Sequence, residues 1–63
     1  MFKCYVGGYD CCAEVIRENH WEPAAVFETF EEAFDYCDRE ACYDDTGWIE
    51  YDGVIHQYFD WDL

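Results

Sequence analysis

The fold is decided between residues 29 and 59, where the sequence reads TFEEAFDYCDREACYDDTGWIEYDGVIHQYF. Its first part contains a capping box: Thr29 is followed three residues later by Glu32, and this pair satisfies free amide groups at a helix start. Apolar and small residues then recur with the period of a helix. The sequence therefore predicts a helix at about 29–42, with an apolar stripe formed by Phe30, Ala33, Phe34, Cys37 and Ala41.

The second part of the stretch predicts a C-terminal β-hairpin at about 48–59. The period changes to two after Gly47, and Asp52-Gly53 is the dipeptide typical of a two-residue type I′ turn. A turn of this length fixes the register of the two strands. The predicted pairs are Tyr51 with Val54 and Ile49 with His56 on one face, and Glu50 with Ile55 and Trp48 with Gln57 on the other. Neither face is purely apolar, so the pattern leaves open which one packs on the helix.

The residues before the helix are expected to add strands to the same sheet. Residues 2–6 alternate in character and predict a first strand, which Gly7-Gly8 should break or bulge. Residues 13–17 contain the β-branched pair Val15-Ile16 and predict a second strand, and residues 25–27 a short third one. Residues 43–47 are expected to end the helix and turn the chain. The fold class is α+β: one domain, residues 1–63, with one helix packed on a small antiparallel sheet.

The charge of the chain excludes several classes of function. The chain has sixteen Asp and Glu but only three Lys and Arg, which gives a net charge of −13, and 22% of its residues are aromatic. Such an aromatic content predicts a folded chain rather than a disordered one. Direct binding to nucleic acid is excluded, because contacts with phosphates need many basic residues. The chain has only Lys3, Arg17 and Arg39. No apolar run reaches the roughly 20 residues of a membrane span. Residues 1–20 carry charges throughout and lack a secretory signal, so we expect a cytoplasmic location.

The cysteines predict free thiols rather than a disulfide framework or a metal centre. Their number is odd, and a protein of the reducing cytoplasm keeps its thiols reduced. Structural zinc needs paired ligands two to four residues apart, a spacing that this set does not repeat. Burial as small apolar residues suits Cys4 and Cys37 best. The five cysteines are Cys4, Cys11, Cys12, Cys37 and Cys42.

No catalytic constellation is present, and we expect neither an enzyme nor a cofactor. The chain has no serine, and a negative surface raises the pKa of a thiol, which works against a cysteine nucleophile. Carboxylate pairs are uninformative where acids are so frequent. The Asp44-Asp45 turn also lacks the alternating ligand spacing of an EF-hand loop, which argues against calcium.

The acidic surface itself remains as the feature that carries function. A net charge of about 2–8 is enough to keep a small domain in solution, and a larger excess costs stability through repulsion. A chain of this length should have a radius of gyration of roughly 10–11 Å, so the acids must be dense on its exterior. The expected partner-binding residues are the outer carboxylates of the helix and the turn after it, with one aromatic anchor: Glu31, Glu32, Asp35, Asp38, Glu40, Asp44, Asp45 and Tyr36. Tyr43 and Trp61 are further anchor candidates, and ordinary packing is the alternative for each aromatic residue.

In size, charge and aromatic content the chain resembles small phage anti-CRISPR proteins and other DNA-mimic inhibitors of bacterial defence. A more local resemblance links three segments to the N-terminal part of antirestriction proteins that mimic DNA. These segments are Tyr5-Val6-Gly7-Gly8-Tyr9, Phe30-Glu31-Glu32-Ala33-Phe34-Asp35-Tyr36-Cys37 and Phe59-Asp60-Trp61-Asp62. The chain is much shorter than that elongated family, so we do not expect it to mimic a long bent duplex.

The resemblance implies a cytoplasmic inhibitor that acts inside a host bacterium. The leading hypothesis is a monomeric, non-enzymatic anti-CRISPR protein that blocks DNA binding by a type I Cascade complex through its basic surface. Two alternatives stay open: an antirestriction DNA mimic, and an acidic interaction module unrelated to DNA, which includes a metal or thiol module built on Cys11, Cys12, Cys37 and Cys42.

Overall fold

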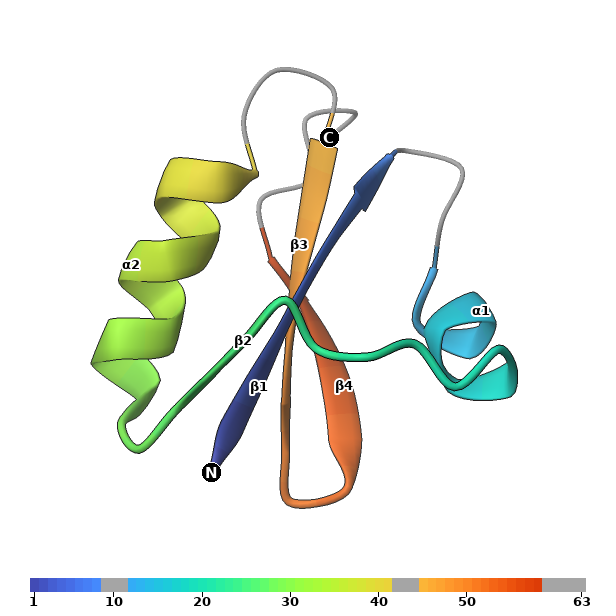
Figure 1. Cartoon of the computed structure of the whole chain (residues 1–63), viewed down its shortest axis with the longest axis horizontal. Helices are drawn as coiled ribbons and strands as arrows, with labels where there is room; N and C mark the ends of the chain where they lie inside the picture. Colours follow the sequence, from blue (N-terminus) through green and yellow to red (C-terminus); the bar gives the residue numbers. More distant parts are fainter. Residues whose placement is uncertain (9–11, 42–44, 59–63) are drawn as a thin grey trace.

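The chain folds into a four-stranded antiparallel sheet with a helix on each face, which confirms the α+β class (Figure 1). The computed structural model describes residues 1–8, 12–41 and 45–58. The strand order is β2-β1-β3-β4. The elements are β1 (Phe2–Gly8), α1 (Ala13–Glu18), β2 (Ala25–Phe27), α2 (Phe30–Glu40), β3 (Asp45–Tyr51) and β4 (Val54–Tyr58). The radius of gyration is 10.5 Å, as predicted from the chain length.

The C-terminal hairpin forms in the predicted register. Tyr51 lies opposite Val54 and Ile49 opposite His56, and the two pairs on the other face also agree with the prediction. Asp52 and Gly53 have φ angles of 53° and 76°, the left-handed values that a type I′ turn requires at both central positions. The dipeptide at the tip therefore sets the pairing of all the residues behind it.

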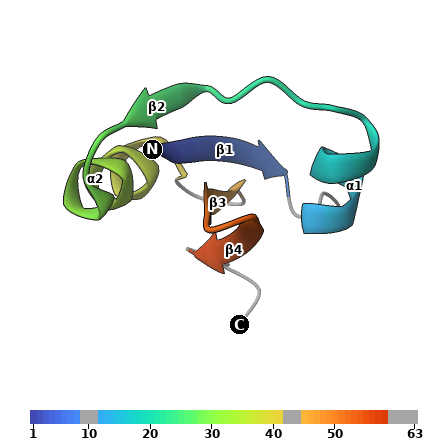
Figure 2. The same ribbon diagram turned by 90° about the horizontal axis from the view of Figure 1, so that it is seen from below.

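The sheet is buried on both faces, and this answers the question that the mixed hairpin left open. In Figure 2 the strands form one layer with α2 on one side and α1 on the other. The α2-side core consists of Cys4, Ala33, Cys37 and Ile49, and aromatic rings surround it. The α1-side core consists of Tyr5, Ile16, Trp48 and Ile55. Successive strand residues point to opposite faces, so neighbours such as Cys4 and Tyr5 are both buried.

Two predictions about the first half of the chain are wrong. Residues 13–17 do not form a strand but belong to α1, because the side chain of Ile16 packs into the α1-side core, where it is 2% exposed. Gly7-Gly8 does not interrupt the first strand either. β1 continues to Gly8, because β3 extends far enough to pair with it. Ala25–Phe27 does form a short strand, as predicted.

Helix α2 begins as predicted and ends slightly earlier. The Thr29 hydroxyl oxygen accepts a hydrogen bond from the backbone N–H of Glu32 at 3.3 Å. The helix ends at Glu40, with Ala41 as its C-terminal cap, rather than at residue 42. The turn predicted for residues 43–47 is wrong from Asp45 onward, because Asp45, Thr46 and Gly47 already pair with β1. Residues 43 and 44 lie outside the described part of the chain.

Gly47 provides the first prediction, because α2 packs closely against the sheet at this residue. A Cβ atom at this position would lie 3.3 Å from the Cβ of Cys37 and 3.4 Å from that of Ala41. We expect Gly47→Val to lower the free energy of unfolding by about 1–3 kcal/mol through overpacking, and Gly47→Ala to lower it less. Urea unfolding followed by tryptophan fluorescence measures both variants. Equal stability of Gly47→Val and the parent would contradict the close packing of α2.

Candidate functional site

The exposed side of α2 carries a line of carboxylates that little positive charge neutralises. Glu31, Asp35 and Asp38 follow one another at i, i+4 and i+7, so at 3.6 residues per turn they share one side of the helix. All three are exposed. We call these three residues the acidic stripe. Its direction is set by the opposite side of α2, where Ala33 and Cys37 have no exposed surface and pack on the sheet.

Glu32 and Glu40 were predicted to share this face, but each lies off the stripe. Glu32 serves the helix start: its carboxylate accepts a hydrogen bond of 2.8 Å from the Thr29 hydroxyl. Glu40 lies nine residues after Glu31, about half a turn around the helix. Its carboxylate is close enough to the Tyr36 phenol to help burial raise the pKa of Tyr36. Both carboxylates are exposed, but they face other directions than the stripe.

The remaining predicted binding residues divide into two groups. The ring of Tyr36 is half-buried and lies 5.6 Å from that of Phe27, so it contributes to packing between α2 and β2. Asp45 is the first residue of β3. The predictions for Asp44, Tyr43 and Trp61 concern residues outside the described part of the chain.

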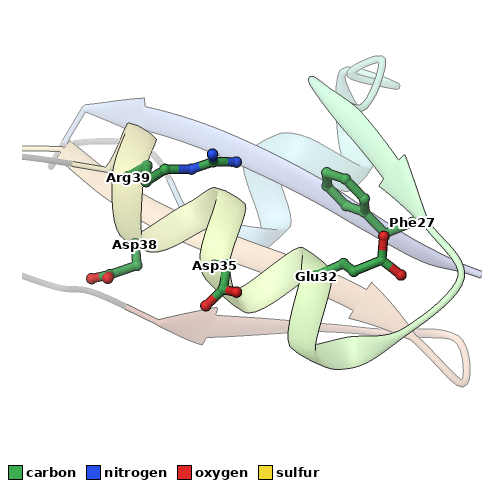
Figure 3. A pocket seen from close by; sticks show the side chains of 5 residues that line it. All are labelled: Phe27, Glu32, Asp35, Asp38 and Arg39. Atoms are coloured by element: carbon green, nitrogen blue, oxygen red, sulfur yellow. The ribbon is translucent and has the colours of Figure 1, made fainter.

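A shallow, open hollow of about 440 Å³ lies along the side of α2 that faces β2. Its lining consists of Phe27, Glu32, Asp35, Asp38 and Arg39 (Figure 3). Arg39 is the only basic residue of α2, and in Figure 3 its guanidinium lies above the helix, whereas the Asp35 carboxylate lies below it. Asp35 and Arg39 are four residues apart, a spacing at which an ion pair can form, but no ion pair joins them in the described part of the chain. The acidic stripe is therefore not neutralised within its own helix.

Phe34 is the site residue that sequence reasoning missed. The helical period assigned it to the buried stripe, yet it is 36% exposed. Together with Phe30, Glu31 and Asp35 it lines a second hollow of about 280 Å³. A signal was available: Phe30-Glu31 is repeated four residues later as Phe34-Asp35, which places an aromatic pair beside an acidic pair on the helix surface.

The described cysteines are arranged as core residues rather than as ligands. Cys4 and Cys37 are fully buried beside one another, and their thiols donate to the carbonyl oxygens of Ala33 and Trp48 respectively. Burial raises the pKa of Cys4, and it raises that of Cys37 to about 12. Cys12 is exposed at the start of α1, on the other side of the sheet. Cys12 and Cys37 are therefore not brought together, and Cys11 and Cys42, the other members of the predicted module, lie outside the described part of the chain.

Three comparisons with known proteins were made. Neither protein-family models, nor curated proteins, nor solved structures match the chain. Within residues 1–8, 12–41 and 45–58, no three His, Cys, Asp or Glu side chains are grouped to hold a metal ion. Nor is any helix in these ranges long and apolar enough to cross a membrane. The charge on α2 thus remains the feature on which a function can be based.

A second prediction concerns alkaline pH. Burial, followed by a 2.7 Å hydrogen bond from its hydroxyl to Glu50, raises the pKa of Tyr5 from 10.0 to about 12. The folded chain therefore retains a proton that the unfolded chain releases between about pH 10 and 12, and the free energy of unfolding must fall as the pH rises through this range. In Tyr5→Phe this fall should be shallower. Urea unfolding at several pH values from 8 to 11.5, under reducing conditions, measures the slope. An unchanged slope would contradict this role of Tyr5.

Proposed function

We propose that the chain is a non-enzymatic inhibitor that mimics DNA and binds the basic nucleic-acid-binding surface of a bacterial defence complex. The observation that carries this proposal is the acidic stripe on α2. A type I Cascade complex, which holds DNA on basic surfaces, is the target class that we propose, and the host cytoplasm is the proposed place of action. The inhibitor itself touches no nucleic acid and acts as a monomer.

The density of charge on α2 resembles that of a single DNA strand. The three carboxylates of the acidic stripe lie between Glu31 and Asp38. At a rise of 1.5 Å per residue, this segment is about 10.5 Å long, which gives about one charge per 3.5 Å of helix axis. One strand of DNA carries one charge per about 3.4 Å of its axis. A basic groove that fits a strand can therefore be neutralised by α2 to a similar degree.

The net charge supports attraction over a longer range. A formal charge of −13 on a body of 28 × 25 × 17 Å gives the chain a strong net negative field. Such a field accelerates the encounter with a positively charged surface and depends on ionic strength. Repulsion among these acids destabilises the fold. A chain with a purely structural role would not need so large a charge.

The dimensions favour an anti-CRISPR role over an antirestriction role. The longest extent of the protein is 28 Å, which corresponds to about eight base pairs of duplex at 3.4 Å each. A body of this size can cover one DNA-binding surface. It cannot imitate the long bent duplex that the elongated antirestriction proteins imitate.

The third prediction tests the acidic stripe directly. The variant Glu31→Gln, Asp35→Asn, Asp38→Asn removes the three stripe charges and leaves the capping residue Glu32 in place. We expect its affinity for a purified Cascade complex to fall at least tenfold relative to the parent at 0.1 M salt. The affinity of the parent should itself fall steeply between 0.1 and 0.5 M salt. Competition against labelled target DNA measures both effects.

A matched control changes the net charge equally on the other side of the sheet. In the variant Glu14→Gln, Glu18→Gln, Glu22→Gln, three exposed carboxylates of α1 and the loop after it are neutralised. We expect this variant to lose much less affinity than the stripe variant. Equal losses of affinity in the two variants would mean that binding depends on the net charge of the chain and not on the position of the carboxylates on α2. Binding that is insensitive to salt would contradict DNA mimicry, and a parallel assay with a type I restriction enzyme tests the alternative target.

A further inference from the structure

The second hollow on α2 combines an aromatic wall with two carboxylates. Phe30, Glu31, Phe34 and Asp35 line it, and its volume is about 280 Å³. This is slightly below the range of about 300–1,000 Å³ that is typical of small-molecule sites. The hollow is therefore large enough for one side chain of a partner, and it lies directly beside the acidic stripe.

The aromatic wall is held in place by the rings around it. The ring of Phe34 lies 5.8 Å from that of Phe30 and 5.9 Å from that of Tyr58. Phe30 in turn contacts Phe2, Tyr51 and Tyr58 with ring distances of 5.8–6.0 Å. A ring that is fixed in this way and still 36% exposed loses little conformational entropy when a partner covers it.

The charges of the hollow define its occupant. Glu31 and Asp35 are one helical turn apart, about 5–6 Å between their Cβ atoms, and both are exposed. None of the four described lining residues is basic. An aromatic face attracts a cation, and the two carboxylates add hydrogen-bond acceptors for it. An apolar or anionic side chain would leave the charge of these carboxylates without a positive partner.

We propose that this hollow binds an arginine side chain of the partner's basic surface. The inference rests on the function proposed above and names the residue that anchors the complex. Arginine fits better than lysine because its planar guanidinium stacks on an aromatic ring while its edge donates to carboxylates. Lysine is a compact, strongly hydrated point charge and gains less from the ring. Phe34 provides the stacking surface, and Glu31 and Asp35 accept the guanidinium hydrogen bonds.

The experiment compares two peptides of equal charge, a capped hexa-arginine and a capped hexa-lysine. Each is titrated into the ¹⁵N-labelled protein while chemical shifts are recorded. We expect hexa-arginine to bind about three- to tenfold more tightly, with the largest differences between the two titrations at the residues of the hollow. In Phe34→Leu, which keeps an apolar side chain but removes the ring, this preference should disappear, with hexa-arginine losing more affinity than hexa-lysine.

A second variant separates the hollow from the general charge. Glu32→Gln, Asp38→Asn removes two carboxylates of α2 outside the hollow, and it should weaken both peptides equally and leave the preference intact. Thermal unfolding of each variant shows whether it is folded. Equal affinities for the parent, or an unchanged preference in folded Phe34→Leu, would overturn the arginine site. Salt-sensitive binding of both peptides would in that case leave the proposed function standing, whereas no binding of either would contradict both.

Discussion

The close approach of α2 to the sheet is the constraint on which the rest of the structure depends. Ala33, Cys37 and Ala41 have almost no exposed surface, and Gly47 leaves room for them. Because only small side chains fit at this contact, α2 has one rotational position in which its small residues meet the sheet. That position turns Glu31, Asp35 and Asp38 outward together. The display of charge therefore follows from packing on the opposite side of the same helix.

Much of the fold could be predicted because local signals and tertiary contacts agree. The Asp52-Gly53 turn fixed the register of β3 and β4, and Thr29 fixed the start of α2. The prediction failed at residues 13–17, where the pair Val15-Ile16 favours a strand. In the structure this segment is a helix of six residues, too short to be stable by itself, and Ile16 holds it against the second face of the sheet. A contact between distant segments thus decided the outcome, and no local pattern contains it.

The candidate site, like the fold, could be predicted only in part. The helical period predicted which α2 residues are exposed, and all five predicted carboxylates of α2 are. It did not show that Glu32 is engaged with Thr29, or that Glu40 faces away from the stripe beside Tyr36. Nor did it show that Phe34, with a regular place in the apolar stripe, remains partly exposed, because this depends on how the rings of Phe30 and Tyr58 pack around it. The function that we propose for this surface depends on the combination of rings and charges, which only the packing reveals.

The central claim is that the carboxylates of α2 lower the free energy of unfolding and are not needed for folding. The most direct measurement is the free energy of urea unfolding of Asp35→Asn, Asp38→Asn, Glu40→Gln in 0.02 M and 0.5 M NaCl. Asp35 has like-charged neighbours at Glu31 and Asp38, and Asp38 and Glu40 lie in the last turn of α2, where the helix dipole opposes a negative charge. The account predicts that the variant is more stable than the parent by about 1 kcal/mol at low salt, and that the difference shrinks at high salt. A variant less stable than the parent at low salt would show that these carboxylates hold the fold together, and would contradict the account.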